Sequence, residues 1–189
     1  METPRPTTLY LLCGKIAAGK STLARRLASR PDTLLIGMDH WMSTLFPVEN
    51  RTIEDFARLS ARLREAMGPH VVGILRQGLS VVLDFPANTV KWRSWMRSLI
   101  EEANVAHELH LLDVSDAVCK ARLRQRNISG DHPYQVDEPT YDLFMKYFIP
   151  PTSDECFNII IHTPDLPPST GSTELGDTAI RSALLGSTD

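Results

Sequence analysis

Short apolar runs alternate with longer amphipathic stretches along this chain. The runs are five to seven residues long and end at turn or polar residues, which is typical of buried strands. They lie at residues 8–13, 33–38, 79–84, 106–112 and 157–161. The stretches between them carry apolar residues at helical spacing, and they predict helices over residues 21–30, 52–67, 88–103, 115–126 and 138–148. This alternation predicts an α/β fold in which helices cover both faces of a five-stranded parallel sheet.

Three stretches depart from this regular pattern. Gly68-Pro69 interrupts the second helix although the apolar spacing resumes after it, which predicts a kink or two consecutive helices that end near Gly78. Residues 43–50 predict an irregular or briefly helical segment. Further along the chain, Asn88 suits the cap of the helix over 88–103. From Thr163 onward Pro, Ser, Thr and Gly dominate. We therefore expect a domain over residues 1–162 and a flexible C-terminal tail over 163–189.

Composition and charge narrow the class of protein. A chain of 189 residues with 42% hydrophobic residues suits one globular domain, and its net charge of −3 argues against bulk affinity for nucleic acid or membrane surfaces. No apolar run reaches the length of a membrane span, and the polar start lacks the apolar core of a signal peptide. We expect a cytoplasmic protein whose three cysteines, which lack metal-ligand spacing, are buried thiols.

The residues from Gly14 to Ser21 fit the pattern G-x-x-x-x-G-K-[ST] at every fixed position, between the first strand and the first helix. Glycines let the backbone N–H groups curl inward around a polyphosphate, and the helix N-terminus favours an anion. Lys20 adds a mobile charge for the β- and γ-phosphates, and the Ser21 hydroxyl is a ligand for Mg²⁺. The sequence therefore predicts a P-loop that binds a nucleoside triphosphate at Gly14, Lys15, Ala17, Ala18, Gly19, Lys20, Ser21 and Thr22.

Acids follow three of the predicted strands. Asp84 ends an apolar strand. In P-loop enzymes an acid at this position holds Mg²⁺ opposite the P-loop hydroxyl, and we expect this role for Asp84; a cap or a turn is the alternative. Asp113 is a poorer match, for which a turn or cap is the better interpretation. Asp39 ends the second strand, where a kinase needs a carboxylate to accept the proton of a hydroxyl. The alternative for Asp39 is an N-cap of the segment over residues 40–45.

A basic run and several aromatic residues complete the candidate site. Four cations lie close together in the run from Lys120 to Arg126, and a loop over residues 127–137 follows. The run and the loop together have the character of a lid over residues 120–137. One or two of these four cations could stabilise the transferring phosphoryl group, and the others would be solvated. Aromatic residues near Asp39 and in the lid could wall an acceptor pocket, at Trp41, Phe46 and Tyr134. Trp92 and Trp95, on a predicted helix, are better explained as core.

Taken together, these motifs resemble those of the bacterial P-loop kinases classed with the AAA-type ATP-binding domains. That group is similar to chloramphenicol phosphotransferase, zeta toxin and the kinase domain of polynucleotide kinase. The resemblance covers residues 7–162 and rests on the P-loop, the strands that end at Asp39 and Asp84, and R-L-x-x-R at Arg122 to Arg126. It implies a three-layer P-loop NTPase fold, like that of a nucleoside kinase, with a helical lid.

The resemblance also implies a reaction. ATP and Mg²⁺ would be the co-substrates, and the γ-phosphate would pass to a hydroxyl. Asp39 would be the base, Lys20 and Ser21 would contact phosphates and metal, and Arg122 and Arg126 would act from the lid. Acceptors differ widely within such a group, so the motifs define the phosphate donor and leave the acceptor open.

Three functions follow from these observations. The first is an ATP-dependent kinase of a small hydroxyl compound, an antibiotic being one candidate. The second is a 5′-end kinase of nucleic acid or a kinase of a sugar nucleotide, and the net charge argues against long nucleic acids as partners. The third is a nucleotide-binding regulator without phosphotransfer, although the N-K-x-D motif that reads guanine is missing from the sequence. The oligomeric state stays open.

Overall fold

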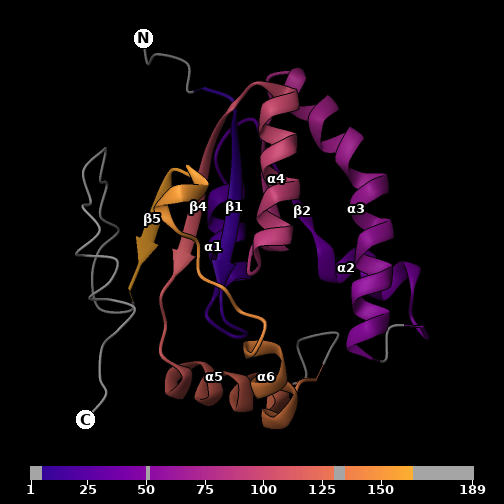
Figure 1. Cartoon of the computed structure of the whole chain (residues 1–189), viewed down its shortest axis with the longest axis vertical. Helices are drawn as coiled ribbons and strands as arrows, with labels where there is room; N and C mark the ends of the chain where they lie inside the picture. Colours follow the sequence, from indigo (N-terminus) through magenta and orange to yellow (C-terminus); the bar gives the residue numbers. More distant parts are fainter. Residues whose placement is uncertain (1–5, 50–51, 130–134, 164–189) are drawn as a thin grey trace.

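The computed structural model describes residues 6–49, 52–129 and 135–163. Its five strands form one sheet in the order β2-β3-β1-β4-β5, and every neighbouring pair is parallel (Figure 1). The strands are β1 (Thr8–Gly14), β2 (Thr33–Gly37), β3 (Ser80–Pro86), β4 (Ala106–Leu112) and β5 (Ile159–His162). The predicted α/β fold with a five-stranded parallel sheet is therefore confirmed. Because all strands run the same way, their carboxyl ends meet at one edge of the sheet.

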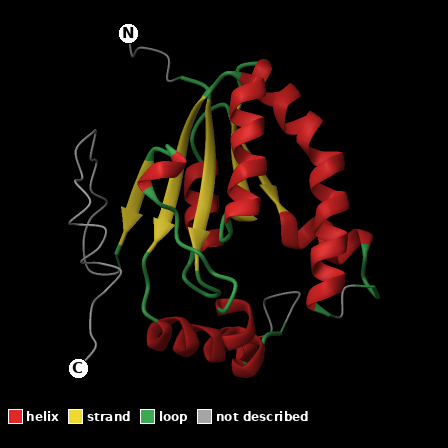
Figure 2. Cartoon of the chain, in the orientation of Figure 1, coloured by secondary structure: helices red, strands yellow, loops and turns green. Residues whose placement is uncertain are grey.

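Six helices surround this sheet in the described part of the chain, with a short 3₁₀ turn at Ser153–Glu155 (Figure 2). In Figure 1, α4 lies in front of the sheet and α3 beside it on the right, and α5 and α6 lie beyond the carboxyl ends of the strands. The helices are α1 (Lys20–Ala28), α2 (Met38–Leu45), α3 (Ile53–Arg76), α4 (Val90–Ala103), α5 (Asp116–Ser129) and α6 (Glu138–Met145).

The central strand β1 divides the core between the two faces of the sheet. All seven of its residues are buried, and successive side chains point to opposite faces. Leu9 and Leu11 pack with residues of α3 and α4, whereas Tyr10 and Leu12 pack with residues of α1 and α5. Full burial of one such leucine stabilises the fold by about 1.5–3 kcal/mol. The P-loop thus follows a strand that is buried along its whole length.

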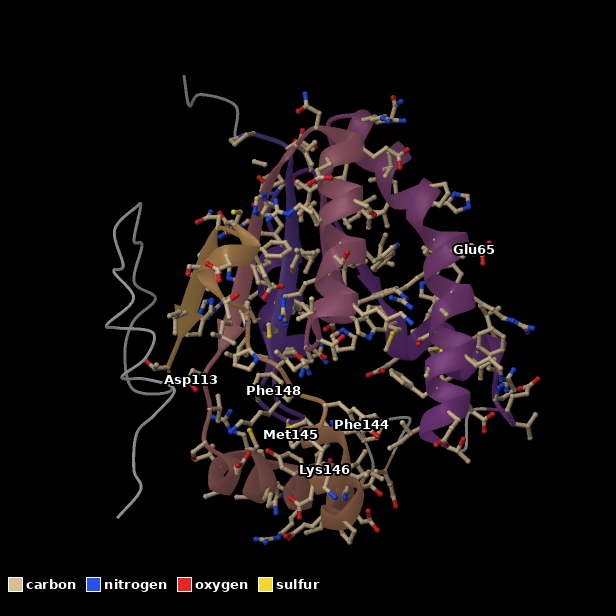
Figure 3. All side chains as sticks on the ribbon, viewed as in Figure 1. Glu65, Asp113, Phe144, Met145, Lys146 and Phe148 are labelled. Carbon is tan, nitrogen blue, oxygen red and sulfur yellow. The ribbon has the colours of Figure 1, made fainter. Side chains whose placement is uncertain are left out.

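The helix α3 runs unbroken through Pro69, whereas the sequence allowed a kink or two helices. Proline removes one N–H donor, which would leave the carbonyl of Glu65 without its helical partner. Both residues are exposed, and Figure 3 shows Glu65 on the outer side of α3, so water can reach that carbonyl. On the inner side Gly68 packs against Trp95 and Leu99 of α4, and this packing keeps the helix straight enough to continue.

Other boundaries also moved. The helix α2 begins at Met38, which was expected to end the second strand, and it includes residues 43–45 of the segment expected to be irregular or briefly helical. The cap of α4 is Thr89, whose hydroxyl accepts a hydrogen bond from the backbone N–H of Trp92, so the predicted cap at Asn88 is wrong. None of the described helices is both long and apolar enough to cross a bilayer. The expected tail lies outside the described residues, apart from Thr163.

Candidate active site

The P-loop follows the end of β1 and adopts a conformation that few residue types allow. The φ angles are +152° at Gly14, +60° at Ala17 and +107° at Gly19. A Cβ atom on Gly14 would lie 3.1 Å from both the Cβ and the carbonyl oxygen of Leu112 on β4, so only glycine fits there without displacing β4. The loop then enters α1 at Lys20, which directs the positive end of that helix toward the loop.

Lys20 is held by the loop that it serves. Its ammonium group donates hydrogen bonds to the carbonyl oxygens of Gly14 and Lys15, each at 2.7 Å. Burial lowers the pKa of Lys20, and the nearby carboxylates of Asp84 and Asp39 oppose that shift. The positive charge is therefore fixed in place where the phosphates of a nucleotide would lie.

Ser21 and Asp84 meet because β3, which carries Asp84, lies beside β1 in the sheet. The Ser21 hydroxyl hydrogen-bonds to Asp84; burial raises the pKa of this carboxyl, and Ser21 and Lys20 oppose the shift. No cluster of three or more acidic, histidine or cysteine ligands occurs among the described residues. The pair therefore fits Mg²⁺, which is held in kinases by one or two protein oxygens together with phosphate oxygens and water.

Asp39 is the second residue of α2 and lies half-buried in the first turn of that helix. The N-cap position is Gly37, so Asp39 does not act as the N-cap that was its alternative interpretation. Its carboxylate is close enough to influence the pKa of Lys20, of Asp84 and of Arg126. The structure thus brings the predicted base, the P-loop lysine and one arginine of the basic run to one place.

The four cations of α5 divide into two pairs. Arg122 donates a hydrogen bond to the carbonyl oxygen of Ala18 in the P-loop, at 3.1 Å. Arg126 is half-buried, and its Nε atom is buried with no hydrogen-bond partner among the described residues. Burial lowers the pKa of Arg126, and Asp39 opposes that shift. Both arginines line the same cleft as Lys20.

The other two cations of α5 face α6. Lys120 lies 2.7 Å from a carboxylate oxygen of Asp142, and Arg124 lies 2.6 Å from one of Glu138. They are therefore paired with acids of α6, whereas the sequence suggested that they would be solvated. Helical spacing explains the division, because residues two apart on a helix point in different directions.

The cleft that these residues share has a volume of about 1580 Å³ and lies between the P-loop, α2, α3, the start of α4, α5 and α6. Aromatic side chains line its far side, at Phe56 of α3 and at Phe144, Tyr147 and Phe148 in and after α6. The rings of Phe56 and Phe144 meet edge to face at 6.1 Å. Figure 3 shows Phe144 and Phe148 on the side of α6 that faces the sheet. An organic molecule could be enclosed there beside Asp39.

These aromatic residues are not the ones that the sequence suggested. Trp41 is 39% exposed and does not line the cleft, because α2 directs it outward. Phe46 packs against the core beside α2 and does not line the cleft either. Tyr134 lies outside the described residues. Trp92 is buried, as expected of a core residue, and it also forms part of the cleft wall.

Two cleft residues escaped the sequence interpretation. The side-chain amide of Asn88 accepts a hydrogen bond from the N–H of Gly14 at 3.0 Å and donates one to its carbonyl oxygen at 2.9 Å. The sequence signal for this role of Asn88 was its position just after β3, the strand that carries Asp84 and lies next to the P-loop strand β1. Arg64 of α3 reaches the cleft and stacks on Trp92 of α4. No local sequence pattern predicts that contact, because it depends on how α3 packs against α4.

The fold and this site define a P-loop domain of the kinase-like class. A family model described as an AAA domain matches residues 9–151, and the chain belongs to that family. A search of curated proteins finds no match to the chain.

Solved structures share the fold at low identity. A protein of Chloroflexus aurantiacus assigned as a kinase has a TM-score of 0.66 and 20% identity, over 84% of this chain and 89% of that one. Kti12 of Chaetomium thermophilum, in complex with ADP-AlF3, has a TM-score of 0.60 and 15% identity, over 83% and 89%. APS kinase CysC of Mycobacterium tuberculosis, in complex with AMPPNP and APS, has a TM-score of 0.58 and 16% identity, over 87% and 92%. At these identities the likeness establishes the P-loop kinase fold.

Proposed function

We propose that this protein is an ATP-dependent phosphotransferase that moves the γ-phosphate of ATP to a hydroxyl group of a small molecule. One observation carries the proposal. Asp39 lines the same cleft as the P-loop and lies within electrostatic reach of Lys20, Asp84 and Arg126. A switch protein needs the P-loop and a metal-binding acid, but it has no need of a carboxylate that faces an enclosed organic pocket.

The reaction assigns one task to each group. Asp39 accepts the proton of the acceptor hydroxyl and orients its oxygen toward the γ-phosphorus. A bond forms between that oxygen and phosphorus, and the bond from phosphorus to the β–γ bridging oxygen breaks, so that ADP leaves with the electron pair. Lys20 and Arg126 stabilise the negative charge that spreads over the transferring group, Arg126 from the side of α5.

Ser21 and Asp84 would hold Mg²⁺, which neutralises charge on the β- and γ-phosphates when bound. The hydrogen bond between Ser21 and Asp84 supports this assignment, because it brings a hydroxyl and a carboxylate to one point.

The nature of the pocket supports a small organic acceptor. Its walls are mostly apolar and aromatic, and α5 and α6 cover it beyond the carboxyl ends of the strands (Figure 1). The APS kinase of similar fold is a kinase of a small molecule by its name, and we extend that substrate class to this chain. An antibiotic with a free hydroxyl belongs to the same class, as the family resemblance suggests.

The Asp39→Asn variant tests this assignment. Loss of the base should lower kcat for an identified acceptor by roughly 10²- to 10⁴-fold, while the Kd for ATP stays nearly unchanged. The matched control is Asp32→Asn, since Asp32 is exposed, lies outside the cleft and has a φ of +53° that asparagine tolerates. ADP release and acceptor mass gain would be measured across a panel of hydroxylated antibiotics, sugars and nucleosides.

Normal turnover in Asp39→Asn would contradict the assignment of the base. Failure of the whole panel, with a large nucleotide-dependent change in binding to a protein partner, would favour a regulator instead. Strong, salt-dependent phosphorylation of an oligonucleotide 5′ end would favour a nucleic-acid kinase. The nucleic-acid kinase is the second candidate because cations outnumber acids in the cleft lining, as the binding of a phosphate backbone would need.

A further inference from the structure

Arg64 stands out among the cleft residues because its guanidinium group is half-buried and stacked. Its central carbon lies 4.4 Å from the ring centroid of Trp92 and 5.9 Å from that of Trp95. Such cation–π contacts use none of the N–H donors of the guanidinium, which remain available to an acceptor. Arg64 is thereby held in one orientation at the wall of the cleft.

Among the residues that the structure describes, no group accepts a hydrogen bond from Arg64, and its Nε atom is buried without a partner there. Burial lowers the pKa of Arg64, and no carboxylate offsets that shift, whereas Asp39 does so for Arg126. Among the described arginines that are not exposed, only Arg64 and Arg126 lack a hydrogen bond, and both line the cleft.

A second arginine near α4 shows what a structural role looks like in this protein. Arg93 is fully buried, and its guanidinium donates to the carboxylate of Glu155 and to the carbonyl oxygens of Ala87 and Ile149. The buried Nε of Arg64 lacks such an acceptor among the described residues, and a buried donor without a partner destabilises the fold, so its retention calls for an explanation. A ligand that brings the missing acceptor supplies one.

The charge of the cleft points the same way. The chain as a whole carries a net charge of −3, but cations outnumber acids in the cleft wall. The cations are Lys20, Arg25, Arg26, Arg64, Lys91, Arg122 and Arg126, and the acids are Asp39, Glu54 and Asp84. A nucleoside triphosphate on the P-loop would be contacted by the cations of α1 and α5. Arg64 and Lys91 lie on α3 and α4, against the opposite face of the sheet, and remain for a second anion.

We infer that the phosphate acceptor is an alcohol that also carries an anionic group, and that Arg64 binds this group through its N–H edge. A carboxylate, a phosphate or a sulfate would serve, because each offers two oxygens to the guanidinium fork. The hydroxyl of the same molecule would then face Asp39, and its organic body would lie against the aromatic wall. Arg64 is thus a specificity-determining residue, and its role rests on the proposed function.

The test uses acceptors that differ only in charge. Sugar alcohols would be compared with the matching sugar acids and sugar phosphates in the ATP-dependent assay of the full-length protein. Charge-assisted hydrogen bonds predict that the best anionic acceptor exceeds its neutral match in kcat/KM by roughly 10- to 100-fold. The acid and phosphate arms separate the two kinds of anion.

Substitution of Arg64 then assigns the preference to one residue. Arg64→Gln should raise KM for the anionic acceptor by roughly 10- to 100-fold, with kcat and the KM for ATP nearly unchanged. Arg64→Lys should recover part of this loss, since it keeps the charge and loses the fork. Arg62→Gln is the matched control, because Arg62 lies on the same helix, is exposed and does not line the cleft.

The outcomes separate the inference from the function on which it rests. Equal use of neutral and anionic acceptors, unaffected by Arg64→Gln, would overturn the inference and leave the kinase intact. If no compound accepts phosphate, the proposed function fails, and binding still tests Arg64. Inorganic phosphate titrated into protein saturated with AMPPNP and Mg²⁺ should then change the indole fluorescence of Trp92 and Trp95. Absence of that change, or its persistence in Arg64→Gln, would also overturn the inference.

Discussion

The two ends of the cleft differ in how their polar groups are satisfied. At the P-loop, Lys20 is hydrogen-bonded to two loop carbonyls, and Asn88 pairs with both backbone groups of Gly14. At the proposed acceptor end, Arg64 lies against Trp92 and has no hydrogen bond among the described residues. The P-loop end is organised mainly by backbone geometry, and the proposed acceptor end depends on side chains brought together by helix packing.

Both ends rest on the same buried ion pair. Arg93 of α4 reaches Glu155 at 2.6 Å and also binds the carbonyl oxygen of Ile149, between α6 and β5. The N–H of Ile149 in turn donates to the carbonyl oxygen of Asn88, which holds Gly14. One connected set of hydrogen bonds therefore joins the segment after α6 to the P-loop.

The Arg93→Met variant removes this support and should have the largest effect. It leaves the Glu155 carboxylate with the Thr152 N–H but without its cation, and it removes a donor from several carbonyls, so the free energy of unfolding should fall by about 3–5 kcal/mol. Denaturant melts followed by circular dichroism would measure the loss. Arg97→Met is the matched control, because Arg97 is half-buried and, within the described part of the chain, donates only to the carbonyl of Glu155. Equal losses in the two variants would mean that Arg93 has no special role.

The same pair gives stability a pH dependence. Burial alone would raise the pKa of Glu155, but hydrogen bonds from Arg93 and from the backbone N–H of Thr152 leave it below its usual value of 4.5. Since the folded-state pKa is the lower one, the stabilisation is complete above about pH 4.5 and is lost as the pH falls through the folded-state pKa. In Arg93→Met, unfolding free energy should change less steeply below that pH, and an unchanged slope would contradict the pairing.

The Asn88→Ala variant should impair the P-loop end selectively. Loss of both hydrogen bonds to Gly14 lets the loop shift, and misplacement of about 1 Å costs up to roughly 10²-fold in rate. We expect kcat/KM for ATP to fall by roughly 10- to 100-fold while the KM for the acceptor changes little. Steady-state kinetics with each substrate varied in turn would separate the two. Asn88→Asp keeps the acceptor for the Gly14 N–H and should lose less; equal effects on both substrates would contradict the division of the cleft.

The division between the two ends also explains what the sequence could predict. The strands, the P-loop and the adjacency of Asp84 to it follow from local patterns, because parallel strands bring their carboxyl ends to one edge. Asp39 was identified by its place after β2, although it proved to lie within α2. Trp41 was misassigned, since its direction depends on the start of α2 at Met38, which the strand pattern concealed.

Long-range packing accounts for the residues that were missed. Arg64 and Trp92 are separated by 28 positions and meet only because α3 packs against α4. Asn88 looked like a helix cap, and an amide serves equally well for a cap or for a backbone clamp. Whether Asn88 forms a cap or a clamp depends on the adjacent strand β1, which brings Gly14 within hydrogen-bond distance. Sequence patterns report one element at a time, whereas the acceptor end is formed by contacts between elements.

A pair of variants on α5 offers the subtlest test of the comparison. Arg122 and Arg124 belong to the same basic run, but Arg122 donates to Ala18 of the P-loop and Arg124 pairs with Glu138 of α6. Arg122→Gln should lower kcat/KM by about tenfold, the effect of one charge-assisted hydrogen bond near the phosphates. Arg124→Gln should leave activity unchanged and alter the free energy of unfolding by less than about 1 kcal/mol, since its ion pair is exposed. Equal kinetic losses would mean that the whole helix, and not its cleft-facing side alone, contributes to phosphate transfer.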